Sequence, residues 1–192
     1  MKTTFTTLLF AGLAALVGAG TVGKRVFSDV YSVSPDNVVY IADAQTFCMI
    51  MPRTAHTDIG VSETPGGMMT FCTHPYSPLQ GTIPPDFFRN VSFVQAMGRS
   101  GKPYVQLTGC IDPTKIDHLN ANDGGGQYDS NGGDGGRGNP IDSECIGYNS
   151  YVELVEPSSH RACIRCCTDT ADCDVSRDTQ GCETVIPGEY FC

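Results

Sequence analysis

The sequence contains no tryptophan and few basic residues. Its 192 residues include 12 lysines and arginines against 21 aspartates and glutamates, which gives a formal net charge of −9. A protein this acidic has no electrostatic basis for binding nucleic acid or an anionic membrane surface. The absence of tryptophan removes a common stacking platform for sugars, so a polysaccharide site would depend on the eight tyrosines and nine phenylalanines.

Recognisable catalytic motifs are also absent from the sequence. It has no His-Glu-x-x-His zinc motif, and residues 60–64 lack the final glycine of a nucleophile elbow. A triad assembled in space remains open, as does a glycosidase carboxyl pair among acids such as Asp112, Asp117, Glu153 and Glu156. The favoured interpretation is that the histidines are solvated or hydrogen-bonded without a catalytic role (His56, His74, His118 and His160).

Long apolar runs are missing, except for one near the N-terminus. Residues 8–17 form a short apolar run behind a basic start and ahead of small residues. This pattern predicts a secretory signal peptide over residues 1–19, because a transmembrane helix needs roughly 20 apolar residues. The dibasic pair Lys24-Arg25 predicts a propeptide over residues 20–25, which leaves a single secreted domain at 26–192. That domain keeps nine bases against all 21 acids, a net charge of −12.

The sequence shows no sustained apolar repeat at helical spacing. Instead, short runs rich in β-branched and aromatic residues alternate with turn segments, at 38–41, 47–50, 68–72, 91–94, 104–107 and 151–156. This pattern predicts an all-β fold, a small disulfide-stabilised sandwich or open barrel with a loop-rich, cysteine-dense C-terminal tail. Only residues 84–88, which begin with two prolines, are expected to open one short helical turn.

Cysteine is abundant, and seven of the ten cysteines lie in the tail, residues 145–192. In an extended chain the adjacent Cys166 and Cys167 point to opposite faces, so they are expected to bond two different partners. The alternative is a zinc or redox site at Cys163-x-x-Cys166, but the predicted secretory compartment favours disulfides. Five disulfides of open connectivity are therefore expected (Cys48, Cys72, Cys110, Cys145, Cys163, Cys166, Cys167, Cys173, Cys182 and Cys192).

Glycine is concentrated in residues 123–139, where eight glycines accompany almost no apolar side chains. This segment is not expected to contribute to a packed core. Its oxygen-bearing side chains make it a calcium candidate, with Asp123, Asp129, Asn131 and Asp134 as ligands. An EF-hand starting at Asp129 would need glycine where Asp134 stands and lacks the closing glutamate. A flexible linker or structural turn without a cofactor is therefore favoured.

Asn90-Val91-Ser92 is the single N-glycosylation sequon of the chain. In a secreted protein the sequon predicts a glycan on Asn90 if the side chain is exposed. The alternative is that Val91 and Phe93 belong to a buried strand.

The C-terminal 40% of the chain resembles small secreted cysteine-rich proteins of fungi, which are mostly without an assigned activity. The residues that carry the resemblance are 124–133, 151–157, 161–167 and 185–191. It implies an extracellular fungal protein that acts at the cell surface or toward a host, and it implies no catalytic residues.

The leading functional hypothesis is a secreted protein that acts by binding, as an effector does. Its partner would be an extracellular polysaccharide, at the fungal cell wall, or a host protein, with no nucleic acid and no membrane insertion. The alternatives are a small extracellular hydrolase acting on wall polysaccharide and a calcium-stabilised structural protein. Two facing acids in a groove would favour the hydrolase.

Overall fold

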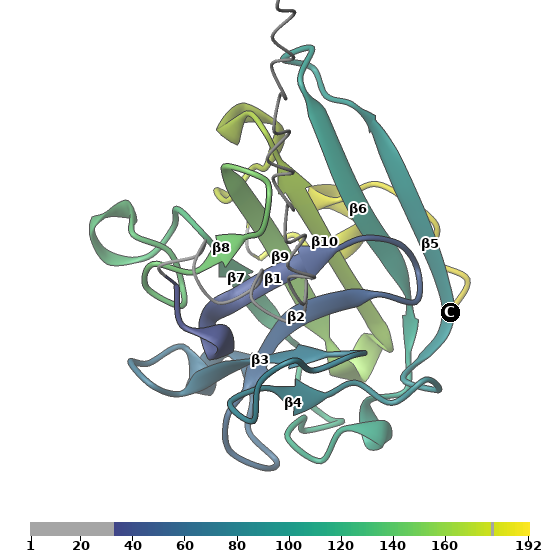
Figure 1. The fold of residues 1–192 in the computed structure, drawn as a ribbon. Coiled ribbons are helices and arrows are strands. Elements are labelled where there is room, and N and C mark those ends of the chain that lie inside the picture. Colours follow the sequence, from purple (N-terminus) through teal and green to yellow (C-terminus); the bar gives the residue numbers. More distant parts are fainter. Residues whose placement is uncertain (1–32, 178) are drawn as a thin grey trace, which may run out of the picture. The chain divides into compact units, whose positions relative to one another are not determined.

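Two five-stranded sheets pack face to face in the computed structural model, which describes residues 33–177 and 179–192 except the side chain of Asp134 (Figure 1). The predicted signal peptide and propeptide fall in residues 1–25, outside the described residues. Within the described part of the chain, no helix is long and apolar enough to cross a membrane.

The first sheet has the strand order β4-β3-β2-β1-β8 and the second the order β5-β6-β10-β9-β7. The first sheet consists of β1 (Val38–Ile41), β2 (Phe47–Pro52), β3 (Met68–Cys72), β4 (Gly81–Thr82) and β8 (Glu144–Cys145). The second consists of β5 (Phe88–Met97), β6 (Pro103–Ile111), β7 (Gly126–Asp129), β9 (Ser150–Glu156) and β10 (Arg161–Cys167). Two short α-helices lie outside the sheets, α1 (Ile59–Ser62) between β2 and β3 and α2 (Cys182–Val185) after the last strand. The prediction of an all-β, disulfide-stabilised fold is confirmed, and the two sheets form a sandwich.

The main core lies between the two sheets. Because successive side chains of a strand alternate between its faces, Tyr151 and Val155 of β9 point into this core. They meet apolar side chains such as Met49 of the first sheet and Leu107 of the second, all of them with no exposed surface. The burial of these side chains is the main stabilising term of the fold.

The second sheet is also buried on its outer face. The intervening β9 side chains, Val152 and Leu154, form a second apolar cluster with Val185 and Ile186 from the C-terminal tail. The strands β9 and β10 are therefore covered on both sides, by the first sheet and by residues 173–190, the part of the C-terminal tail that follows β10. This explains why the run from 161 to 167 serves as a central strand, which its cysteine-rich sequence did not predict.

Most predicted strands coincide with observed ones. β1 and β3 match their predicted runs residue for residue, and 91–94 and 104–107 lie inside the longer strands β5 and β6. The helical turn predicted at 84–88 is wrong. Phe87 N–H donates to the carbonyl of Pro84 in a single turn, and Phe88 then pairs with Ile111 as the first residue of β5.

The prediction that the glycine-rich segment adds nothing to the core is also wrong. Its residues 126–129 form β7, which pairs antiparallel with β9 at the edge of the second sheet. Tyr128 of β7 has no exposed surface and lies in the main core. One strand residue with a large aromatic ring thus anchors a segment whose composition is otherwise that of a loop.

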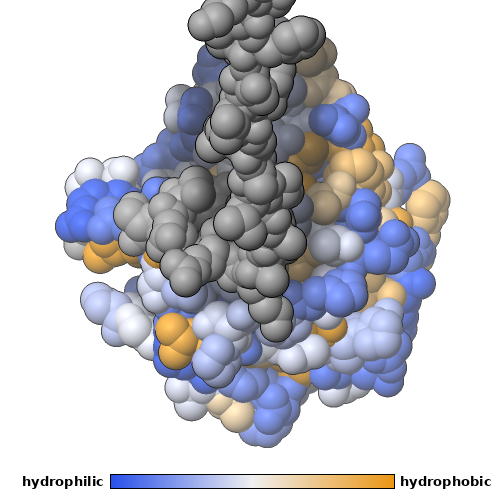
Figure 2. Space-filling model, viewed as in Figure 1, coloured by the Kyte–Doolittle hydropathy of each residue, from blue (hydrophilic) through white to orange (hydrophobic). Residues whose placement is uncertain are grey.

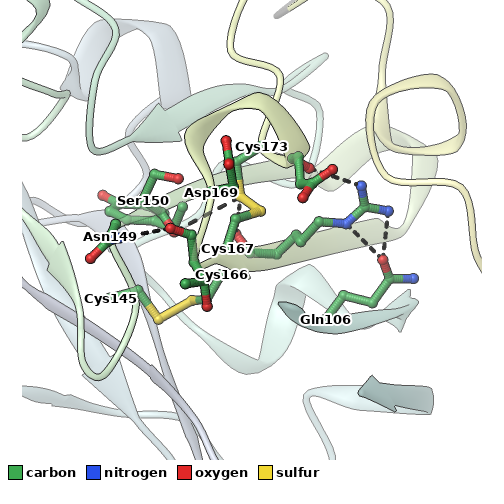
Figure 3. The surroundings of a disulfide bond; sticks show 12 residues. Gln106, Cys145, Asn149, Ser150, Cys166, Cys167, Asp169 and Cys173 are labelled. Carbon is green, nitrogen blue, oxygen red and sulfur yellow. Dashed lines mark hydrogen bonds between the residues drawn. A yellow bond between two sulfur atoms is a disulfide. The ribbon is translucent and has the colours of Figure 1, made fainter. Parts of the chain in front are cut away.

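All ten cysteines are paired in the structure. The five disulfides are Cys48–Cys72, Cys110–Cys192, Cys145–Cys166, Cys163–Cys182 and Cys167–Cys173. As expected, the adjacent Cys166 and Cys167 bond different partners, and Figure 3 shows the two disulfides leaving the strand in different directions. Cys166 links β10 to β8, and so joins the two sheets, while Cys167 holds the tail on the outer face.

Candidate functional site

A buried polar cluster lies between the sheets around Glu153 of β9. This carboxyl has no exposed surface, and its Oε2 accepts a hydrogen bond of 3.0 Å from the backbone N–H of Ile50. Its Oε1 has no hydrogen-bond partner among the described residues. Burial raises the pKa of Glu153 well above its usual value, which favours the protonated acid at neutral pH.

Two tyrosines of the same core each form a hydrogen bond with a serine. The hydroxyl of Tyr128 lies 2.7 Å from Ser62 Oγ, and the hydroxyl of Tyr151 lies 2.7 Å from Ser143 Oγ. Burial raises the pKa of both tyrosines, and the neighbouring carboxyl of Glu153 raises it further. These groups are enclosed in the core, so their hydrogen bonds serve the packing of the two sheets.

Two of the acids considered as a glycosidase pair, Glu153 and Glu156, do not face one another in this structure. Glu153 and Glu156 are three residues apart on β9 and therefore point to opposite faces of the sheet. Glu156 accepts from Arg161 and from the backbone of Cys182. Asp112 accepts from Thr114 and Arg89, which lower its pKa to about 2.

His118 has a structural environment. His118 Nδ1 lies 2.8 Å from the carbonyl oxygen of Pro52, and its ring packs edge-on against Phe71 at 4.9 Å between centroids. Within the described residues, no histidine contacts both a serine and an aspartate through the hydrogen bonds and ion pairs observed.

The glycine-rich loop uses its calcium candidates as hydrogen-bond acceptors. Asp123 Oδ2 accepts from the backbone N–H of Ile59 at 2.8 Å. Asp129 Oδ1 accepts from the backbone N–H groups of Asn131 and Gly132. Among the described residues there is no group of three or more histidine, cysteine or acidic side chains placed to hold a metal ion. Asn131 Oδ1 accepts from Ser130, and the side chain of Asp134 lies outside the described part.

The sequon residue Asn90 lies on β5, at the open edge of the second sheet. Its side chain is partly exposed. Val91 and Phe93 pack against the main core from the same strand, and Met97 near its end is exposed. Figure 2 shows hydrophobic surface along the hairpin of β5 and β6, beside mixed polar surface. Glycosylation of Asn90 stays a prediction, on a strand edge where a glycan would be accessible.

The outer face of the second sheet carries a pocket of about 590 Å³, named here the tail pocket. Its walls are residues 97–99 at the β5–β6 turn, Tyr104 of β6, Asn131 of the glycine-rich loop, Arg165 of β10, residues 170–177, and Thr184, Val185 and Pro187. Three arginines line it, Arg99, Arg165 and Arg177. Two further pockets, of about 610 and 400 Å³, border the glycine-rich loop and carry one arginine between them, Arg53.

Arg165 is held in a defined position in the tail pocket. Its Nε and Nη2 donate to Gln106 Oε1 at 2.9 and 2.7 Å, and its Nη1 donates to the carbonyl of Asp172 at 3.2 Å. The guanidinium also lies over the ring of Tyr104, 4.7 Å from the centroid. Burial lowers the pKa of Arg165, an effect partly opposed by nearby Tyr104 and Asp172.

Sequence reasoning missed the tail pocket. Arg99, Arg165 and Arg177 are spread over 79 positions and fall in a hairpin turn, a central strand and a tail loop. The only available signal was the small number of bases, which makes three arginines in one place unusual. The strand pairing of β5, β6 and β10 brings the first two together, and the disulfides bring the third.

Comparison of the chain with protein families, with curated proteins and with solved structures finds no match in any of the three. The site is therefore interpreted from its own geometry.

Proposed function

We propose that this chain is a secreted protein that acts by binding, at a fungal cell surface or on extracellular molecules of a host, as an effector does. Its five disulfides suit a protein that must stay folded outside the cell among proteases. The partner would be an extracellular polysaccharide or a host protein.

The observation that carries this proposal is the way disulfides hold the walls of the tail pocket. Cys167–Cys173 ties the loop that begins at residue 170 to β10, and Cys163–Cys182 ties α2 to the same strand. Loops fixed before a ligand arrives lose little conformational entropy on binding. A pocket with cross-linked walls is therefore suited to recognition.

A pull-down of the secreted protein tests this function. The immobilised mature chain is incubated with fungal wall polysaccharides and with host extracellular extract, with and without chelator. The control is the same chain after reduction and alkylation, which has the same sequence but lacks the disulfide-held pocket. Saturable retention of one fraction by the native protein alone supports binding. Equal retention by both samples, or slow loss of a polymer without retention, contradicts it, and the loss points to a hydrolase.

A further inference from the structure

The unpaired cations of this acidic protein gather at one place. Nine lysines and arginines follow residue 33. Six of them form ion pairs with carboxylates, for example Arg53 with Asp36 at 2.6 Å. Within the described part of the chain, the three that form none are Arg99, Lys102 and Arg165. Arg99 and Arg165 line the tail pocket, and Lys102 ends the same β5–β6 turn.

Asp172, an acid in the wall of the tail pocket, does not neutralise Arg165 by direct contact of its carboxylate. Asp172 meets this guanidinium through its backbone carbonyl, while its carboxylate accepts from the hydroxyl and the backbone N–H of Ser100. The Nε and one N–H each of Nη1 and Nη2 are engaged with Gln106 and the carbonyl. A guanidinium has five N–H donors, so two are left without a partner among the described residues.

A half-buried, oriented guanidinium with spare donors is suited to an anion. Partial burial removes some of the water that would otherwise solvate the charge, and an opposite charge in the pocket would compensate for that loss. Gln106 occupies the Nε and Nη2 edge of this guanidinium, so the oxygens of a carboxylate or sulfate would be met by the one N–H that each of Nη1 and Nη2 keeps. Gln106 and Tyr104 already hold the guanidinium in place, so an anion would not have to order it.

We infer that the tail pocket binds a single oxoanion group, a carboxylate or a sulfate carried by an extracellular ligand, through Arg165 and Arg99. This inference rests on the proposed binding function and narrows its ligand. The predicted secreted domain, residues 26–192, has nine bases against 21 acids, and this net charge of −12 opposes a polyanion through long-range repulsion, so one anionic group on a weakly charged molecule is the ligand that fits.

Titration of the isotope-labelled secreted protein, followed by amide NMR signals, tests the inference. The first probe is sodium sulfate, and its control is sodium chloride at equal ionic strength. The second probe is sodium glucuronate, and its control is neutral glucose. We expect saturable shifts of residues 98–102 and 170–177 with a probe and not with its control. Saturable shifts with only one of the two probes still support an oxoanion site. Shifts with sulfate indicate a ligand that carries a sulfate group, and shifts with glucuronate indicate one that carries a carboxylate. Equal shifts in chloride would overturn the inference.

Two pocket substitutions and one control outside the pocket separate binding at the tail pocket from general charge effects. Arg99→Gln, at an exposed turn residue, is expected to weaken sulfate binding about tenfold, since one charge-assisted contact is lost. Arg89→Gln removes the same charge from β5 outside the pocket and should leave binding unchanged. Arg165→Lys keeps the charge but loses the fork, so its affinity should also fall. If both pocket variants bind sulfate like wild type, the inference fails, whereas pull-down retention that persists in them leaves the proposed function standing.

Discussion

At the scale of the residue, Glu153 shows how a polar group is tolerated inside this sandwich. One oxygen receives the backbone N–H of Ile50, and the other has no partner among the described residues. A charged carboxylate in this position would be costly, so the group is expected to keep its proton. Burial of an incompletely bonded acid lowers the free energy of unfolding relative to a fully satisfied residue.

Glu153 therefore predicts a fall in stability as the pH rises. The unfolded chain releases this proton near the ordinary value of 4.5, while the folded protein retains it because burial raises the pKa. The contribution to stability is thus fully present below pH 4.5 and declines above it, with a slope of up to about 1.4 kcal/mol per pH unit. Glu153→Gln should remove this slope. Urea unfolding between pH 4 and pH 8 measures it, with exposed Glu144→Gln as the control.

An unchanged slope in Glu153→Gln would contradict the protonated-core interpretation. The substitution keeps an acceptor for Ile50, so a general loss of stability at every pH would instead indicate a packing defect. The two outcomes are distinguishable because only the first concerns the pH dependence.

Gly125 offers a second test at the residue scale. Its φ of +101° is one that residues with a side chain rarely adopt, and a Cβ there would overlap the carbonyl of Val155 and lie 2.8 Å from Cα of Glu156. Gly125→Ala is expected to cost about 2 kcal/mol or more of the free energy of unfolding. Gly124→Ala is the matched control, because its Cβ would meet nothing within 4 Å. Chemical denaturation of both variants measures the difference, and equal stabilities would mean that β7 does not lie against β9 as described.

At the scale of the element, β10 holds the structure together through the opposite directions of its side chains. Cys166 faces the main core and reaches β8, while Cys163 and Cys167 face the tail. The same alternation places Arg165 in the tail pocket between the two tail-facing cysteines. β10 therefore bonds the two sheets to each other through Cys166 and also places Arg165 in the candidate site.

Removing one disulfide at a time should separate the two roles of β10, which are bonding the two sheets and positioning the tail pocket. Cys145→Ala/Cys166→Ala opens a loop of sequence separation 21 and Cys167→Ala/Cys173→Ala one of 6. Chain entropy predicts losses of about 3 and about 2 kcal/mol of the free energy of unfolding, respectively. The second variant should also weaken sulfate binding, because it frees the wall of the tail pocket, whereas the first should not. Guanidinium unfolding and the NMR titration measure the two effects, and the reverse pattern would contradict the assignment of roles.

At the scale of the whole molecule, the glycine-rich loop is held by the chain itself. The carboxylates of Asp123 and Asp129 already accept backbone N–H groups, and Asn139 donates to Glu63 at 2.8 Å. These contacts anchor the loop to α1 and to β7 without any further ligand.

We therefore expect the melting temperature to change by less than about 1 °C between chelator and millimolar calcium. A ligand that binds only the folded state stabilises it by RT ln(1 + [L]/Kd), so a calcium site filled at millimolar calcium would raise the melting temperature by several degrees. Differential scanning calorimetry of the secreted protein measures this, with magnesium as the control for ionic strength. A rise specific to calcium would restore the calcium-stabilised structural interpretation.

The sequence determined the strands and the use of its cysteines. Runs such as 38–41 and 68–72 became strands because they are short apolar runs bounded by turn segments. Adjacent cysteines in an extended chain point to opposite faces, so Cys166 and Cys167 bond different partners. Only the tertiary structure decided which cysteines pair, that a glycine-rich segment supplies a core strand, and that Arg99 and Arg165 share a pocket. These depend on which strands become neighbours, and that order is set by contacts between residues far apart in the sequence.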